Sequence, residues 1–311
     1  MAFTAQDVAK LRELTGAGMM DCKRALTETD GDMEKAAVYL RENGVAVAAK
    51  KASRVASEGV VWAYTDKNGK KGALVEVNCE SDFVAKGAAF TGLCESIAAA
   101  ASDRAPRDLE ALLQAKTADG ATVQEALTAA TAKIGEKISL RRFAFESADG
   151  RVESYTHMGG KIGVLLVVKT DKDINNNEEF ATACHDVAMH IAAFSPKYTY
   201  DSEVPAAEVE AERGILRAQT VNDPKNAKKP AEIVEKMLEG RIKKFYKEIC
   251  LIDQDFVKDP SVTVKGLFEG LGKRLGADIR IVKFERFVMG EGLEKKNENF
   301  AEEIAKLSGQ R

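Results

Sequence analysis

The sequence predicts an α+β protein in which small antiparallel sheets are covered by helices. Apolar residues follow a helical spacing through residues 4–40, and an alternation of period two replaces that spacing from Gly59 onward. The alternating segment and the helix after it then return about 91 residues later. We therefore expect an N-terminal three-helix domain, two related subdomains, an inserted helical hairpin forming a coiled coil, and a C-terminal helical module.

Residues 1–55 are expected to form the three-helix domain. Thr4 can cap the first helix, and two further helices follow, the last ending before Gly44. The Ala- and Lys-rich segment 45–57 has no strong apolar stripe, so we interpret it as a linker that could itself be helical. The apolar positions of the first helix are Val8, Leu11 and Leu14.

Residues 56–148 are expected to form the first subdomain. Two strands flank a turn at 66–69, a helix follows, and a third candidate strand runs from Ile138 to Phe145. A Thr122-x-x-Glu125 capping box marks the start of a helix before that last strand. The apolar face of the first two strands carries Val60, Trp62, Tyr64, Ala73, Val75, Val77 and Cys79. The face of the helix carries Phe90, Cys94, Ile97, Ala98 and Ala101.

Residues 149–288 repeat this pattern and are expected to form the second subdomain. Its strand residues lie 91 positions after their counterparts: Tyr155, Gly163, Leu165 and Val168 match Tyr64, Gly72, Leu74 and Val77. Its helix residues lie 90 positions on: Phe180, Cys184, Val187, Ala188 and Ile191. Because a hairpin and a helix recur in the same order and phase, the two halves should share one fold.

Two segments fall outside this repeat. The insertion at about 203–252 is predicted to be a helical hairpin, with a proline-containing break at 222–230 between its arms. The final candidate strand of the second subdomain then runs from Ile279 to Phe287, and residues 289–311 form the C-terminal module. Its expected helix bears Phe300, Ile304 and Leu307.

Composition and charge argue against several classes of function. The net charge of −3 gives no global field for nucleic acid, and the hydrophobic fraction of 45% and charged fraction of 31% do not suggest a membrane span. The N-terminus lacks a basic region followed by an apolar stretch, so we expect a cytoplasmic protein. Five widely spaced cysteines without a C-x-x-C pattern predict neither disulfides nor a zinc site.

No catalytic set emerges from the sequence. His185 and His190 lie five apart, which does not place them on one helix face as a metal pair, so a core or surface role is expected. The run 159–162 resembles the end of a phosphate loop but lacks the first glycine and the final Ser or Thr, so it is interpreted as a hairpin turn. We therefore expect no enzyme activity, no cofactor and no metal.

Four motifs together resemble the bacterial elongation factor Ts family over essentially the whole chain. They are the runs 14–26, 76–86, 155–164 and 287–295, and the second reads Glu76-Val-Asn-Cys-Glu-Ser-Asp-Phe-Val-Ala-Lys86. Three positions depart from the usual family pattern: Ser81 replaces Thr, Met158 stands where Gly is frequent, and Lys161 stands where Arg is frequent.

The resemblance implies a guanine-nucleotide exchange factor for elongation factor Tu that acts in translation elongation, the chain-lengthening stage of protein biosynthesis. It implies that the three N-terminal helices are a ubiquitin-associated-like domain that docks on the nucleotide-binding domain of the partner. It also implies that Phe83 enters a pocket near the partner's magnesium site, so that magnesium and GDP are released. The complex is expected with GDP-bound and nucleotide-free elongation factor Tu, either one-to-one or as a dimer of heterodimers. The implied contacts are Ser81, Asp82, Phe83, Val84, His157, Ile134, Met19 and Met20.

The residues by themselves leave alternatives open. Phe83 lies seven residues before Phe90, so periodicity alone slightly favours a core position for it. Met19 and Met20 could be core residues of a small helical domain, although two adjacent side chains cannot both face one core. Two other classes of function remain: an adaptor or chaperone that is indifferent to GDP, and a small-molecule enzyme that uses His157.

Overall fold

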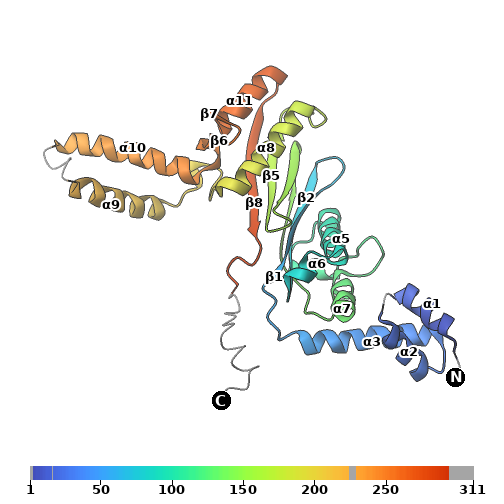
Figure 1. Ribbon diagram of the computed structural model, residues 1–311. Coiled ribbons are helices and arrows are strands. Elements are labelled where there is room, and N and C mark those ends of the chain that lie inside the picture. The colour runs from blue at the N-terminus through green and yellow to red at the C-terminus, as the bar shows by residue number, and fades with distance from the viewer. Residues whose placement is uncertain (1–2, 16, 224–228, 294–311) are drawn as a thin grey trace, which may run out of the picture.

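The computed structural model describes residues 3–15, 17–223 and 229–293, and it confirms the predicted α+β class (Figure 1). The N-terminal helices are α1 (Ala5–Thr15), α2 (Met19–Glu28) and α3 (Met33–Lys51). The backbone N–H of Asp7 donates to Thr4 Oγ1 at 3.3 Å, as expected for an N-cap. Leu14, predicted to share the apolar face of α1, is instead 71% exposed. The helix predicted for 300–307 lies outside the described residues.

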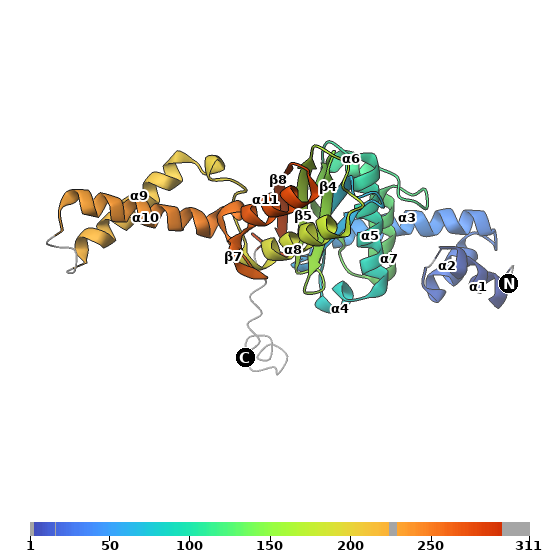
Figure 2. The same cartoon turned by 90° about the horizontal axis from the view of Figure 1, so that it is seen from above.

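The predicted end of the third helix before Gly44 is wrong, since α3 continues to Lys51. Gly44 is buried in α3, and a Cβ atom at Gly44 would lie 3.5 Å from Ala132 in α7 (Val123–Ile134). Packing against α7 therefore keeps the helix intact at a residue of low helix propensity. Much of the predicted linker is helical, and α3 carries the first two helices away from the sheets (Figures 1 and 2).

The first sheet has the antiparallel order β1-β2-β3, from β1 (Glu58–Thr65), β2 (Lys71–Cys79) and β3 (Ser139–Ser147). Between the last two strands the chain forms α4 (Asp82–Ala85), α5 (Ala88–Arg104), α6 (Leu109–Gln114) and α7. The predicted apolar faces of the two strands and of α5 meet in one core, and the capping box of α7 is formed.

The second sheet repeats this topology with the order β4-β5-β8, from β4 (Arg151–His157), β5 (Ile162–Thr170) and β8 (Ile279–Val288). Its outer face is covered by α8 (Glu178–Phe194) and by α11 (Val264–Leu275). The sequence reasoning missed α11 and the short strands before it, β6 (Asp255–Phe256) and β7 (Asp259–Thr263). Val264, Phe268 and Leu271, at helical spacing, are the signal that would have found α11.

The repeat extends to irregular backbone features. A register shift occurs between Glu76 and Val77 in the first sheet, and another occurs 91 residues later, between Val167 and Val168. The covering helices α5 and α8 both end in the left-handed conformation, at Ala105 (φ 48°) and Ser195 (φ 51°). Because these features are not required by the apolar pattern alone, their recurrence supports one fold for both halves.

The two sheets pack face to face, and glycine makes this close approach feasible. Val61, Leu74, Val152, Leu165 and Phe287 form the buried layer between them. A Cβ atom at Gly163 would lie 2.5 Å from Val61 Cγ1 and 2.6 Å from Leu74 Cδ1, and Gly72 is similarly close to Val152. The repeated glycines therefore set the distance between the sheets.

The predicted helical hairpin is present as α9 (Ala206–Asn222) and α10 (Ala231–Ile249), and it extends from the side opposite α1–α3 (Figure 2). Short 3₁₀ turns at Asp201–Glu203 and Leu251–Asp253 flank it. Leu216, Leu238 and Ile242 form a small core between the two helices. Within the described part of the chain, no helix is long and apolar enough to cross a membrane.

Candidate functional site

The short helix α4 presents Phe83 to solvent directly after β2. Phe83 is 85% exposed, while Ala85 is only 5% exposed and Val84 packs against the core of the first sheet. The alternative that Phe83 continues the buried face of Phe90 is wrong, because α4 ends at Ala85 and α5 begins at Ala88. The seven-residue spacing would align the two rings only on one continuous helix.

Residues 80–85 form the Phe83 tip, and Glu136 holds its first residues in place. Its carboxylate accepts hydrogen bonds from the backbone N–H groups of Glu80 and Ser81, both at 3.0 Å, and from Ser81 Oγ at 2.6 Å. Ser81 Oγ in turn accepts the Val84 N–H at 3.3 Å and so caps α4. Ser81, predicted as a contact residue, therefore also caps the helix that bears Phe83.

A second carboxylate, that of Glu80 in the tip, accepts a hydrogen bond from the segment that carries Glu136. Glu80 accepts the Lys137 N–H at 2.6 Å and pairs with Arg54 at 3.3 Å. Burial alone would raise the pKa of Glu80, but the hydrogen bond from Lys137 and the charge of Arg54 outweigh burial and lower it. Sequence reasoning missed Glu80 and Glu136 as functional residues, since they are 56 positions apart and no local pattern links them.

Asp82 is ionised and already paired. Its carboxylate lies 2.7 Å from Lys86 Nζ, one helical turn on, and this hydrogen bond and charge lower the pKa of Asp82. Cys79, just before the tip, is buried, and burial raises the pKa of its thiol to about 12. That thiol is therefore not a nucleophile at neutral pH.

His157 lies at the end of β4, opposite Ile162, with Nδ1 2.9 Å from Tyr155 Oη. The turn that follows rests against β1, because the Val61 N–H donates to the Gly160 carbonyl at 2.8 Å. Lys161 Nζ lies 3.2 Å from Glu58, and its charge also contributes to the lowered pKa of Asp82. The structure thus brings the turn at residues 157–161, the His157 turn, close to α4.

Ile134 is connected to the tip through Glu136, two residues later. It is the last residue of α7, half-buried against the core of the first sheet, and Glu136 follows after the left-handed Gly135. The Lys51 ammonium donates to the Gly135 carbonyl, which ties this corner to the end of α3. Five positions of the candidate site, Ser81–Val84 and Ile134, therefore belong to one connected structure.

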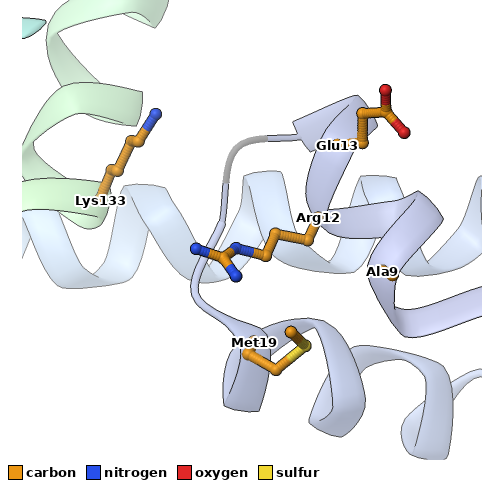
Figure 3. A pocket seen from close by; sticks show the side chains of 5 residues that line it. All are labelled: Ala9, Arg12, Glu13, Met19 and Lys133. Carbon is orange, nitrogen blue, oxygen red and sulfur yellow. The ribbon is translucent and has the colours of Figure 1, made fainter. Parts of the chain in front are cut away.

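Met19 and Met20 lie at the start of α2, one of the three N-terminal helices (Figure 1). They are 46% and 73% exposed, so the alternative that they are ordinary core residues is wrong. Met19 lines a shallow pocket together with Ala9, Arg12, Glu13 and, from α7, Lys133 (Figure 3). The two methionines therefore belong to the N-terminal helices, and Met19 faces the end of α7, where Lys133 precedes Ile134.

The histidines of α8 have the core and surface roles expected. His190 is buried with Nε2 2.9 Å from Gln254 Oε1, and burial lowers its pKa. His185 is paired with Glu153 at 3.2 Å. In the described ranges, no group of three His, Cys, Asp or Glu side chains could hold a metal ion.

Comparisons with known proteins agree on one family. The model of the family described as Elongation factor TS matches residues 80–291. The chain is 48% identical to Elongation factor Ts of Clostridium perfringens (strain SM101 / Type A) over 308 residues, which cover 99% of each chain. It is 47% identical to Elongation factor Ts of Symbiobacterium thermophilum over 310 residues, covering 99% of this chain and 98% of the relative.

Proposed function

The chain belongs to the elongation factor Ts family, whose members are nucleotide-exchange factors of elongation factor Tu, and we propose how it performs this exchange. It binds GDP-bound elongation factor Tu, promotes the release of GDP and magnesium, and remains bound to the nucleotide-free form. The proposed complex involves no nucleic acid and no membrane.

The observation that supports this mechanism is the 85% exposure of Phe83 on a tip whose backbone is held by Glu136. An exposed phenyl ring on a fixed backbone loses little conformational entropy when a pocket receives it. Inserted near the partner's magnesium site, the ring displaces a switch segment, and Asp82 helps to reposition that region once its pair with Lys86 opens. Magnesium and the GDP phosphates then lose well-placed ligands.

The surrounding residues serve the same interface in this proposal. Ser81 and Val84 flank the ring, and Ile134 and His157 contact the partner from either side of α4. Met19 and Met20 form a second contact, on the nucleotide-binding domain of elongation factor Tu, for which flexible thioethers are suited. Contacts from two domains allow one to hold the partner while the other acts on its nucleotide site.

The free energy of burying one ring limits how much Phe83 can contribute to the acceleration of GDP release. Burial of one Phe side chain stabilises by roughly 1.5–3 kcal/mol, and each ~1.4 kcal/mol of barrier changes a rate about tenfold. Phe83 alone can therefore supply about a ten- to a hundredfold acceleration. Because coupling between two ligands is reciprocal, the protein must weaken GDP binding by the same factor as GDP weakens binding of the protein.

The decisive measurement is the release of fluorescent GDP from elongation factor Tu in the presence of this protein or its Phe83→Ala variant. We expect the unmutated protein to accelerate release and the variant to lose about ten- to a hundredfold of that acceleration. The melting temperature should not change, since the ring is exposed. Phe194→Ala removes a half-exposed ring of α8 that stacks on His190, and it is the control for loss of a ring away from the tip, expected to leave stimulated GDP release unchanged.

Four outcomes separate the candidate functions. No acceleration by the unmutated protein would reject the exchange function. Full acceleration by Phe83→Ala would keep that function but show that Phe83 does not drive nucleotide release. Binding to elongation factor Tu that is indifferent to GDP would instead favour an adaptor. Turnover of a metabolite that His157→Ala abolishes and Phe83→Ala spares would favour an enzyme.

A further inference from the structure

Met158 combines two unfavourable properties on one residue. Its backbone has φ 49°, in the left-handed region, and its side chain is 71% exposed. The other described non-glycine residues with positive φ are Asp30, Ala105 and Ser195, all small or polar. A large apolar side chain in this conformation carries a backbone cost that glycine would not have, and its exposure gains no burial in return.

The turn that carries Met158 is held in place by its neighbours. A Cβ atom at Gly160 would lie 2.5 Å from Val60 Cγ1, so only glycine fits against β1 there. The backbone N–H of Met289 donates to the Lys161 carbonyl at 2.9 Å, and the Lys161 ammonium pairs with Glu58. These contacts explain the path of the turn, but none of them uses the Met158 side chain.

The same contacts place this turn beside the Phe83 tip. Glu58, the partner of Lys161, begins β1, and α4 packs against β1. The charge of Lys161 acts on Asp82. The turn and α4 are therefore close enough for one partner surface to cover both.

We propose that Met158 is a second apolar contact to elongation factor Tu, placed beside Phe83 and received by an apolar surface next to the pocket for that ring. This inference rests on the proposed exchange function. A thioether chain is flexible and polarisable, so it can fit such a surface while its backbone stays fixed. The left-handed backbone at Met158 costs conformational free energy, and the contribution of the side chain to binding offsets this cost. Strained residues are common at ligand sites for this reason.

The test compares Met158→Gly, Met158→Asn and Met158→Leu in binding to nucleotide-free elongation factor Tu and in GDP release. Gly and Asn both tolerate the left-handed conformation, so the melting temperatures of these variants should be unchanged or higher. Their affinity for the partner should fall roughly tenfold or more, as expected for the loss of one buried apolar side chain. Met158→Leu should retain most of the affinity, because it keeps the apolar volume.

Each other result overturns the inference in a distinct way. Unchanged affinity of Met158→Gly, while Phe83→Ala slows GDP release, would reject the role of Met158 and leave the exchange function intact. Lower melting temperatures of both Met158→Gly and Met158→Asn would show that the side chain serves the protein's own fold. No acceleration of GDP release by the unmutated protein would reject the exchange function and this inference together.

Discussion

At the scale of single residues, the Phe83 tip depends on one carboxylate that lies far from it in the sequence. Glu136 accepts three hydrogen bonds from Glu80 and Ser81, and these two residues precede α4 directly. A charged acceptor makes stronger hydrogen bonds than a neutral one, so this carboxylate limits the directions in which the tip can move. A tip held in this way is ready for insertion before the partner arrives.

Replacement of Glu136 by Gln should therefore loosen the tip without removing Phe83. The amide oxygen can still accept the two backbone N–H groups and the NH₂ group can donate to Ser81 Oγ, but the charge is lost, so charge-assisted hydrogen bonds become weaker neutral ones at a cost of roughly 1–2 kcal/mol. We expect slower stimulated GDP release and faster hydrogen exchange at the amides of Ser81 and Val84. Glu110→Gln, an exposed site on α6, makes the same charge change and should leave both unchanged. Equal behaviour of the two variants would contradict this account.

At the scale of elements, the α9–α10 hairpin has its own small core. Leu238 is fully buried, and Arg241 Nη1 donates to Thr220 Oγ1 at 2.9 Å across the two helices. This cluster is separate from the cores that cover the two sheets. Damage to it should therefore stay local.

Leu238→Ala tests this independence, since it removes a buried side chain at a cost of roughly 2–5 kcal/mol. We expect the amides of α9 and α10 to exchange hydrogen faster while those of β5 keep their protection. Ile233→Ala, on α10 but 47% exposed, is the matched control and should change neither region. Loss of protection throughout β5 in Leu238→Ala would show that the hairpin and the sheets unfold together.

At the scale of the whole molecule, the two sheets position the candidate site. The Phe83 tip belongs to the first subdomain and the His157 turn to the second, so their separation depends on how the sheets pack. We propose that the parts 1–55, 56–148, 149–288 and 289–311 are separate units joined by such contacts. The distinct cores of the first three support this division.

Gly163→Ala should disturb this packing, because the new Cβ atom would lie 2.5 Å from Val61 Cγ1. Overpacking of this kind costs roughly 1–3 kcal/mol. We expect a lower melting temperature together with slower stimulated GDP release, since the His157 turn shifts relative to α4. Gly92→Ala, at an open position in α5, should instead stabilise by about 0.5–1 kcal/mol and leave exchange unchanged. Similar melting temperatures of the two variants would contradict this view of the sheet interface.

Local patterns in the sequence were sufficient for most of the architecture. Alternation and helical spacing predicted the faces of β1, β2 and α5, and the 91-residue offset predicted that β4, β5 and α8 repeat them. These patterns are informative because a buried face imposes its period on the chain directly. The repeated glycines were visible too, but their role in the approach of the two sheets was not.

Only the tertiary structure decided the features that depend on distant contacts. Periodicity alone slightly favoured a buried Phe83. In the structure the helix is interrupted between α4 and α5, and the ring is exposed. Helix α3 continues through Gly44 because α7 packs against it. The hydrogen bonds of Glu136 and the approach of the His157 turn to α4 join segments more than fifty residues apart. A one-dimensional pattern carries the period of a face, but not which distant group will contact it.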